Sequence, residues 1–270
     1  MISLSQQEFH LLADYVYKYC GIDLKQKKHL IASRLHSHLV EEGFVSFTAF
    51  YKHLLQDTSG ETITAMLDRI TTNHTYFMRE CQHFDFFKDQ VLPELQSKVK
   101  NRDLRIWSAG CSSGEEAYTL AMIISDFFGP QQGAWDTRIL ATDISTRALQ
   151  KARRGVYTVD EIKVLPASWK LDYFRVIDRN SARIVDNIKR QVIFRRFNLM
   201  EKRYPFKQQF HVIFCRNVMI YFDALTRREL VQRFYDFIVD GGYLYIGQAE
   251  SIKRDHDRFR YVTTAVYRKE

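Results

Sequence analysis

This 270-residue sequence lacks several features that would fix the class of a protein at once. No run of about eighteen apolar residues occurs, so the sequence predicts no segment that spans a membrane. The first residues, "MISLSQQEFHLL", lack the basic start and apolar core of a secretory signal peptide. We therefore expect a cytoplasmic protein with reduced thiols. The four cysteines lie far apart and form no C-x-x-C pair, which predicts neither a metal site nor a disulfide framework: Cys20, Cys81, Cys111 and Cys215.

Apolar side chains, in contrast, are plentiful. Hydrophobic residues make up 46% of the chain, with 20 Phe and 15 Tyr among them, which is enough for a sizeable core and argues against disorder. The length fits one large domain, or a moderate domain with a smaller partner. The formal net charge of +8 is compatible with an acidic protein partner, an anionic membrane surface or nucleic acid. Its visible sources, "KQKK" (25–28) and "KARR" (151–154), are also typical of solvated helix faces, so charge alone does not identify a partner.

The first part of the chain is predicted to be helical. Ser5 and Glu8 have the spacing of a capping box, and Ser46 stands where it would cap a later helix. We expect an N-terminal helical domain with its linker over residues 1–92, built as a small bundle. Four apolar stripes with helical spacing mark its core: Phe9, Leu12, Val16 and Cys20; Ile31, Leu35 and Leu39, ended by Gly43; Phe47, Phe50 and Leu54; and Ile63, Met66, Leu67 and Ile70.

After "KNRD" (100–103) the pattern changes to short apolar strands that alternate with helices. Alternation of this kind predicts an α/β domain with a doubly wound, mostly parallel sheet over residues 93–270. We expect the helix through Leu230, Phe234 and Phe237 to be closed by Gly241-Gly242. The expected strands are 104–109, 137–143, 192–199, 211–217, 243–247 and 261–268, and the other helices are 115–127 and one through Ala148 and Ala152.

One segment interrupts the alternation. Between Gly155 and Gln191, about forty residues stand where a short connection would serve, too many for a plain loop. The runs "ARIVD" (182–186) and "QVIFRR" (191–196) have strand character, which predicts an inserted antiparallel β-subdomain at about 156–191. From the residues alone, this insert serves either partner recognition or no function beyond a surface embellishment.

The stretch "GCSSG" (110–114) lies between an expected strand and an expected helix, and it is open to two interpretations. It fits Gly-x-Ser-x-Gly, the nucleophile elbow of an esterase, with Ser112 as nucleophile and His211 or His256 as partner. Upstream of the expected strand at 104–109, however, the sequence predicts only helices, so no earlier strand supplies an oxyanion loop. A phosphate loop is disfavoured because no Gly-Lys-Ser/Thr follows, and the G-x-G-x-x-G spacing of nicotinamide sites is absent. The alternative is a glycine turn that holds another cofactor.

The acidic residues around this turn favour that alternative. Glu115 and Glu116 open the helix, and although acidic residues suit a helix N-terminus, here they would also repel a phosphate and attract a cation. Asp143 ends the next expected strand, where it could accept hydrogen bonds from ribose hydroxyls. S-adenosylmethionine combines a ribose, a positive charge and no phosphate, and it fits these features.

Five motifs, in order along the chain, carry a family resemblance: "TTNHTYFMRE" (71–80), "WSAGCSSGEEAYTLAM" (107–122), "LATDIS" (140–145), "FNL" (197–199) and "VIFCRNVMIYFD" (212–223). Together they closely resemble the CheR-type chemotaxis receptor methyltransferases, through nearly the whole chain. The resemblance implies a class I methyltransferase that uses S-adenosylmethionine to esterify glutamates on cytoplasmic helices of chemoreceptors, leaving S-adenosylhomocysteine. It also implies that the insert is the family's β-subdomain, which in some members docks a receptor's C-terminal peptide.

The same resemblance assigns roles to residues of the matching motifs. Arg79 and Tyr221 would stand near the transferring methyl group as the catalytic pair. Glu115 would meet the methionine ammonium group, and Asp143 the ribose. The remaining cofactor contacts would be Asn73, Thr75 and Arg79 from the helical domain, Gly110 in the turn, Asn198 and Leu199 beside the adenine, and Arg216 and Asn217 on the far side of the pocket.

Other interpretations of these residues stay open. Arg79 could pair with Glu80 or Asp85 on a helix surface, and Tyr221 could be a core residue. A nucleic-acid methyltransferase would suit the net charge, but the Asn/Asp-Pro-Pro-aromatic motif common in enzymes that methylate base amines is replaced by the proline-free "CRNVMIYF". We therefore expect no nucleic-acid partner. A module that binds the cofactor without turning it over is the remaining alternative.

Overall fold

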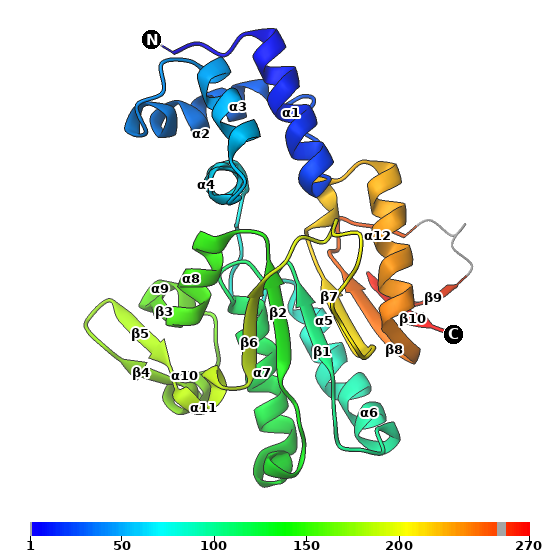
Figure 1. Cartoon of the computed structure of the whole chain (residues 1–270). Helices are drawn as coiled ribbons and strands as arrows, with labels where there is room; N and C mark the ends of the chain where they lie inside the picture. The colour runs from blue at the N-terminus through cyan, green and yellow to red at the C-terminus, as the bar shows by residue number, and fades with distance from the viewer. Residues whose placement is uncertain (1, 253–257) are drawn as a thin grey trace.

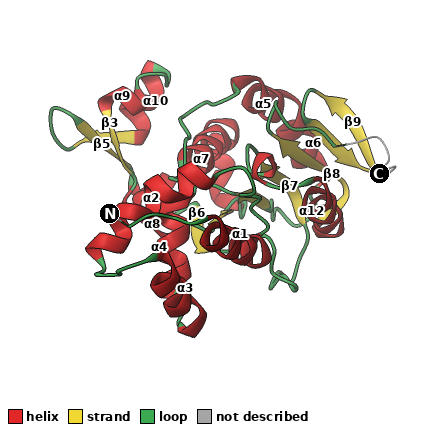
Figure 2. Cartoon of the chain, turned by 90° about the horizontal axis from the view of Figure 1, so that it is seen from above, coloured by secondary structure: helices red, strands yellow, loops and turns green. Residues whose placement is uncertain are grey.

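The computed structural model describes residues 2–252 and 258–270. The chain forms a helical bundle above an α/β body, with a small subdomain projecting from one side (Figure 1). From above, the bundle helices overlie the middle of the body, with the projecting subdomain on the left and the C-terminal strands on the right (Figure 2). Among the described helices, none is both long and apolar enough to cross a bilayer.

The bundle contains the four helices that the sequence predicts. The capping box is confirmed: Ser5 Oγ accepts from the Glu8 amide, and the Glu8 side chain accepts from the Ser5 amide. Ser46 caps its helix in a similar way, by accepting from the Ala49 amide at 3.1 Å. The predicted stripes form one buried cluster. The helices are α1 (Gln6–Cys20), α2 (Lys28–Glu41), α3 (Phe47–Gln56) and α4 (Glu61–Ile70).

The hydrophobic clusters place the boundary between the helical bundle and the α/β body earlier than residue 92. The hydrophobic cluster of the bundle ends at Ile70. Buried side chains from Phe77 to Leu95 belong instead to the hydrophobic cluster between the sheet and α7. Helices that cover a sheet and helices of a bundle have the same apolar periodicity, so the sequence pattern did not separate them. The segment contains α5 (Cys81–Phe86), a π-helical turn η1 (Phe87–Val91) and α6 (Leu92–Lys98).

The body is built on a seven-stranded sheet. The strand order is β6-β2-β1-β7-β8-β10-β9, and β10 runs antiparallel to both of its neighbours. The pairs from β6 to β8 are parallel, which confirms the doubly wound arrangement. The strands are β1 (Ile106–Ala109), β2 (Ile139–Asp143), β6 (Val192–Arg196), β7 (Phe210–Cys215), β8 (Ile238–Ile246), β9 (Phe259–Thr263) and β10 (Val266–Lys269).

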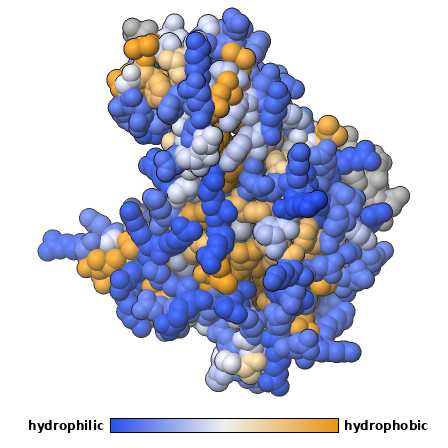
Figure 3. Space-filling model, in the orientation of Figure 1, coloured by the Kyte–Doolittle hydropathy of each residue, from blue (hydrophilic) through white to orange (hydrophobic). Residues whose placement is uncertain are grey.

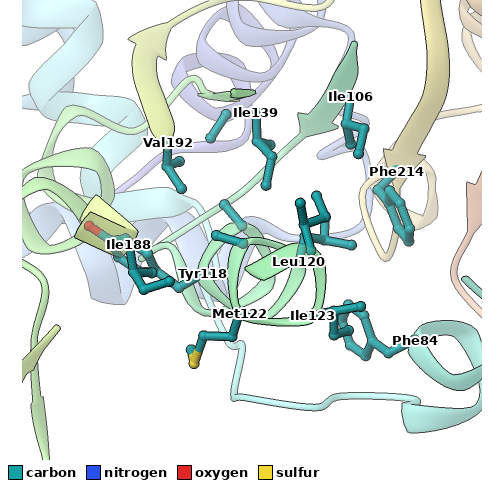
Figure 4. Packing of buried hydrophobic residues seen from close by; sticks show 14 of the residues in the cluster. Phe84, Ile106, Tyr118, Leu120, Met122, Ile123, Ile139, Ile188, Val192 and Phe214 are labelled. Atoms are coloured by element: carbon teal, nitrogen blue, oxygen red, sulfur yellow. The ribbon is translucent and has the colours of Figure 1, made fainter. Parts of the chain in front are cut away.

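Helices cover both faces of the sheet. On one face, Leu120 of α7 faces Ile106 and Ile139 of the strands, and Ile123 faces Phe84 of α5 (Figure 4). On the other face, α12 packs in a second cluster around Trp107. Burial of apolar surface at about 25 cal/mol per Å² supplies the main stabilising force for these layers. The helices and helical turns are α7 (Glu115–Phe128), η2 (Gly129–Ala134), α8 (Thr146–Arg154), η3 (Met219–Tyr221) and α12 (Ala224–Phe237).

The predicted insert is present and forms the projecting subdomain (Figure 1). Its three strands pair antiparallel in the order β3-β5-β4. Lys151 Nζ, at the end of α8, donates to Glu161 and joins the subdomain to the body. The elements are β3 (Val156–Thr158), α9 (Val159–Ile162), α10 (Ala167–Tyr173), β4 (Phe174–Val176), β5 (Ser181–Ile184) and α11 (Asp186–Lys189).

Two predictions near the C-terminus are wrong. Gly241-Gly242 do not close α12, which ends at Phe237; they lie inside β8. A Cβ atom on Gly242 would stand 2.8 Å from the carbonyl oxygen of His211, so glycine is required there by the close neighbouring strand. The single strand expected at 261–268 is a hairpin of β9 and β10, because Thr264 and Ala265 form a turn in which Ala265 has a φ of 59°.

Candidate active site

A cavity of about 350 Å³ lies between the helical bundle and the carboxyl ends of β1, β2, β6 and β7. Its position is the crevice in which open α/β sheets bind their ligands. Figure 3 shows the molecule narrowing where the bundle meets the body. The residues that line the cavity come from both sides of this junction. Ten of the residues assigned above line it: Asn73, Thr75, Arg79, Gly110, Asp143, Asn198, Leu199, Arg216, Asn217 and Tyr221.

The glycine turn follows β1 and opens α7. Gly110, Ser112 and Gly114 have φ angles of 92°, 49° and 96°, in the left-handed region that favours glycine. A Cβ atom on Gly110 would lie 2.3 Å from Val218 Cγ2, and one on Gly114 would lie 2.9 Å from Ala152 Cβ. The glycines therefore allow two parts of the chain to approach the turn, and Gly110 also lines the cavity, whereas Gly114 does not.

Ser112 has the contacts of a turn residue. Its amide donates to Asp143 Oδ2 at 2.8 Å, and its hydroxyl donates to the Asn73 carbonyl oxygen at 3.1 Å instead of to an imidazole. His211 accepts from the Arg105 amide at 3.0 Å, and burial lowers the pKa of His211 to about 4. The other suggested partner, His256, lies outside the described residues. The described residues therefore assemble no esterase triad around Ser112.

The structure does not bring Glu115 to the cavity. Its carboxylate is 1% exposed, accepts from Ser113 Oγ at 2.7 and 2.8 Å, and has Lys151 Nζ at 3.7 Å. Burial raises the pKa of Glu115. Successive residues of an α-helix point about 100° apart, and it is the neighbouring Glu116 that lines the cavity. Because α7 is buried on nearly all sides, its sequence has no apolar stripe that would have shown which glutamate faces which way.

Asp143 ends β2 and lines the cavity where the two domains meet. Its carboxylate accepts from the amides of Ser112 and Ser145, each at 2.8 Å. Burial raises the pKa of Asp143, and these amides oppose the shift. Asn73 Nδ2 donates to Ser145 Oγ at 3.2 Å, and that hydroxyl donates to Asp68 of α4 at 2.6 Å. The segment after α4 is therefore fixed to the carboxyl end of β2.

Arg216 holds the opposite wall together. Its guanidinium is 2% exposed and donates to Glu116 at 3.0 Å, to Glu80 at 3.1 Å and to the Arg79 carbonyl oxygen. Burial works against ionisation of Glu80, but Arg216 and Asn217 hold the pKa of Glu80 below its usual value. Glu80 is thus bound to Arg216, which contradicts the alternative in which Arg79 pairs with Glu80.

Arg79 occupies an unusual stretch of backbone. The residues on either side, Met78 and Glu80, both have positive φ angles, of 60° and 55°. Such conformations cost about 1–3 kcal/mol each in residues other than glycine and occur where surrounding contacts enforce them. The Arg79 guanidinium donates to the His74 carbonyl oxygen at 2.8 Å and lies 5.9 Å from the Tyr76 ring. These contacts keep the guanidinium at the cavity.

The remaining wall comes from the loops after β6 and β7. Asn198 donates to the carbonyl oxygen of Tyr19 in α1 at 2.6 Å. Asn217 donates to Glu80 Oε1 at 3.2 Å. Tyr221 is 36% exposed, and its hydroxyl donates to the Thr72 carbonyl oxygen at 3.3 Å, so it is not a core residue. Both of these loops therefore contact segments of the helical domain or its linker.

Further residues at the site had no specific contact assigned to them from the sequence. Glu116, Asp23 and Lys27 line the cavity. Glu250 does not line it, but accepts hydrogen bonds from backbone amides of the loop after β7. Asp23 and Lys27 lie in a surface turn with no motif, and Glu250 lies in a segment that carries none of the matched motifs. Among the described residues, no group of three or more His, Cys, Asp or Glu side chains is arranged to hold a metal ion.

The strand order has a single antiparallel strand, β10, next to the last strand of the parallel run, and the cavity at the carboxyl ends of the strands is lined by the carboxylates of Glu116 and Asp143. Together with the match to a SAM-binding family model, this defines a class I methyltransferase that uses S-adenosylmethionine. The chain belongs to the CheR methyltransferase family. The family model described as "CheR methyltransferase, SAM binding domain" matches residues 73–268, and "CheR methyltransferase, all-alpha domain" matches residues 7–71.

Relatives match along almost the entire chain. A chemotaxis protein methyltransferase from Borreliella burgdorferi is 41% identical over 99% of this chain and 96% of its own length. One from Escherichia coli is 34% identical over 98% of this chain and 92% of its own length. A solved S-adenosylmethionine dependent methyltransferase from Mesorhizobium loti matches at a TM-score of 0.30 and 15% identity, over 57% of this chain and 51% of that chain, which is too distant to carry an argument.

We predict that Gly110→Ala weakens binding of S-adenosylhomocysteine by at least about tenfold, or about 1.4 kcal/mol. The added methyl group would meet Val218 Cγ2 at 2.3 Å and displace a cavity wall. Gly129→Ala is the matched control, because Gly129 also has a positive φ but has no atom within 4 Å of its Cβ position. Titration calorimetry measures both affinities. Equal affinities of the two variants would contradict the prediction.

We predict that Ser112→Ala weakens cofactor binding by about threefold, the usual effect of one lost hydrogen bond, and retains methyl transfer. The variant loses only the contact with the Asn73 carbonyl oxygen. Calorimetry with S-adenosylhomocysteine and a single-turnover assay measure the two properties. Complete loss of transfer with intact cofactor binding would restore the interpretation of Ser112 as a nucleophile.

Proposed function

We propose that this protein transfers the methyl group of S-adenosylmethionine to glutamate side-chain carboxylates on cytoplasmic helices of chemoreceptors. The products would be glutamyl methyl esters, which serve in chemotaxis adaptation, and S-adenosylhomocysteine. The observation that carries the proposal is the convergence of five motifs, one from the linker and four from the α/β body, on one cavity, in a chain 41% identical to a chemotaxis protein methyltransferase. A cytoplasmic location belongs to the same proposal.

The cavity suits the cofactor chemically. Asp143 would accept from the ribose hydroxyls, and Glu116, in the place first assigned to Glu115, would meet the ammonium group. Asn198 and Leu199 would flank the adenine. Arg216 and Asn217 would line the far side, and Asn73, Thr75 and Arg79 would close the cavity from the linker, with Gly110 at the turn.

The reaction needs little from the protein beyond placement. A glutamate side chain has a pKa of about 4.3 in water and is already a nucleophilic carboxylate at neutral pH, so no general base is required. The cofactor's sulfonium supplies an activated methyl group. Holding the reactants in line is a large effect, because effective molarities of about 10⁵ M or more are known for well-oriented groups.

Arg79 and Tyr221 would provide this placement. One nitrogen of Arg79 is bound to the His74 carbonyl oxygen, and a guanidinium has five N–H donors, so others remain for an incoming carboxylate. Tyr221 lines the same cavity and is held by the Thr72 carbonyl oxygen. We therefore assign Arg79 as the guide for the substrate carboxylate and Tyr221 as the wall beside the transferring methyl group.

The basic surface of the helical domain would steer the acceptor. Lys25 and Lys27 are exposed, and Lys27 also lines the cavity, so positive charge lies at its edge. Acidic receptor helices would be attracted to it. Arg34 of the same domain does not take part, because it donates to the carbonyl oxygens of Ile70 and Thr71 at 2.7 and 3.2 Å. Its role is to cap the end of α4.

The projecting subdomain would dock a receptor's C-terminal peptide. Apolar side chains are exposed on this part of the molecule (Figure 3). Val176, at the end of β4, is 81% exposed, and Leu171 is 76% exposed. Among the described strands, β4 pairs only with β5 and is an edge strand, to which an extended peptide can add by backbone hydrogen bonds.

The experiment that tests the proposal uses methyl-labelled S-adenosylmethionine and cytoplasmic fragments of a panel of chemoreceptors. We predict that label enters the fragments and is released as volatile methanol on treatment with base, because glutamyl methyl esters are base-labile. N-methyl products retain the label, so a base-stable product would indicate the nucleic-acid or amine class of methyltransferase. Cofactor binding without transfer to any fragment would indicate a module that binds the cofactor without turnover.

A second experiment tests the steering surface. We predict that the double variant Lys25→Glu, Lys27→Glu associates with receptor fragments about tenfold more slowly at low salt and with a weaker salt dependence. The matched control is the double variant Lys88→Glu, Lys100→Glu, which makes the same change in net charge at two exposed positions away from the cavity. Stopped-flow measurements over a range of salt concentrations give the rates. Identical rates and slopes for both variants would contradict the steering role.

A further inference from the structure

Glu250 is a buried carboxylate behind the wall of the cavity. Its side chain accepts from three backbone amides: those of Asn217 at 3.0 Å, Ile220 at 3.0 Å and Gly247 at 2.6 Å. The residue is 8% exposed and does not line the cavity, so it would not touch the cofactor or the acceptor. Burial raises the pKa of Glu250, and its bonds with these amides act in the opposite direction.

The loop that Glu250 binds is the one that carries Asn217 and Tyr221. Asn217 has a φ of 58°, in the left-handed region that asparagine adopts more readily than most residues other than glycine. Glu250 accepts hydrogen bonds from the amide of Asn217 and from the amide of Ile220, the residue immediately before Tyr221. One carboxylate therefore fixes both ends of the segment that contributes to the cavity.

Gly247 and Asp23 contact the same loop and its carboxylate from two sides. A Cβ atom on Gly247 would stand 2.6 Å from Asn217 Nδ2 and 2.9 Å from Glu250 Oε2, so only glycine lets the end of β8 approach the loop so closely. On the other side, the amide of Asp23 donates to the Tyr221 carbonyl oxygen at 2.8 Å. The helical turn of Tyr221 is thus held between Glu250 and the helical domain.

We propose that Glu250 is a positioning residue for methyl transfer, which sets the loop from Asn217 to Tyr221 by accepting its backbone amides. The inference rests on the role proposed above for Tyr221. The two carboxylate oxygens of Glu250 bind different amides: Oε2 accepts from Asn217 and Gly247, and Oε1 accepts from Ile220. A displacement of about 1 Å in a reacting group can reduce a rate about a hundredfold, so small movements of Tyr221 would be measurable.

Glu250→Gln separates positioning from folding. The variant has the same shape, and its carbonyl oxygen can replace Oε2, but its amide group would then face the Ile220 amide, donor against donor. We expect kcat to fall between about tenfold and a hundredfold, with KM for S-adenosylmethionine and the affinity for S-adenosylhomocysteine within about threefold of the parent. Amide hydrogen exchange at Ile220 and Tyr221 should accelerate in the variant.

Glu229→Gln on the exposed face of α12 is the matched control, and it should alter none of these measurements. If Glu250→Gln does not fold, Glu250→Asp is measured in its place, because it keeps the charge and both acceptors on a shorter side chain. Unchanged kcat and exchange would overturn the proposal, as would a parallel loss of cofactor affinity and kcat/KM. A parent protein that methylates no receptor fragment contradicts the proposed acceptor instead, while the exchange comparison still tests Glu250.

Discussion

The buried Arg216 is the residue on which the architecture of the site depends. A cation taken out of water must be compensated by charge and hydrogen bonds, and Arg216 finds this compensation in Glu80, Glu116 and the Arg79 carbonyl oxygen. These partners come from the linker and from the first turn of α7, while Arg216 itself follows β7. The Phe84 ring lies 5.1 Å from the guanidinium and covers it on the α5 side. Three distant parts of the chain are thus joined at one charge, and removing it would leave two carboxylates without their main counter-charge.

The two carboxylates that line the cavity beneath the linker, Asp143 and Glu116, share one arrangement, in which both oxygens of each accept a hydrogen bond from the protein. Asp143 accepts from the amides of Ser112 and Ser145. Glu116 accepts from the Ser108 hydroxyl and the Arg216 guanidinium. Acidic groups held in this way can bind the hydroxyl and ammonium groups of a cofactor without free movement. A carboxylate acceptor needs no base, so the protein's contribution to the proposed reaction reduces to geometry. The bundle takes part in that geometry, because Thr72, Asp23 and Tyr19 hold Tyr221 and Asn198.

Much of this structure follows from local sequence. The capping box at Ser5, the four apolar stripes of the bundle and the alternation of strands and helices depend on neighbours a few residues apart, and all three are confirmed. The turn at Gly110 was located but was first explained by the cofactor, whereas Val218, over a hundred residues later, comes closest to it. The hairpin of β9 and β10 was missed because Thr264 and Ala265 are not typical turn residues.

The sequence by itself determined most of the elements, their order, the insert and the set of motifs, since these are properties of periodicity and of residue type. Tertiary structure alone decided which glutamate of the pair at 115 and 116 faces the cavity, because that depends on how a helix buried on nearly all sides is rotated. It also decided that α5 and α6 belong to the sheet rather than to the bundle. Finally, it placed Glu250 behind Tyr221. A carboxylate that binds backbone amides leaves no pattern in the segment it holds, and its role became visible only when the chain had folded around it.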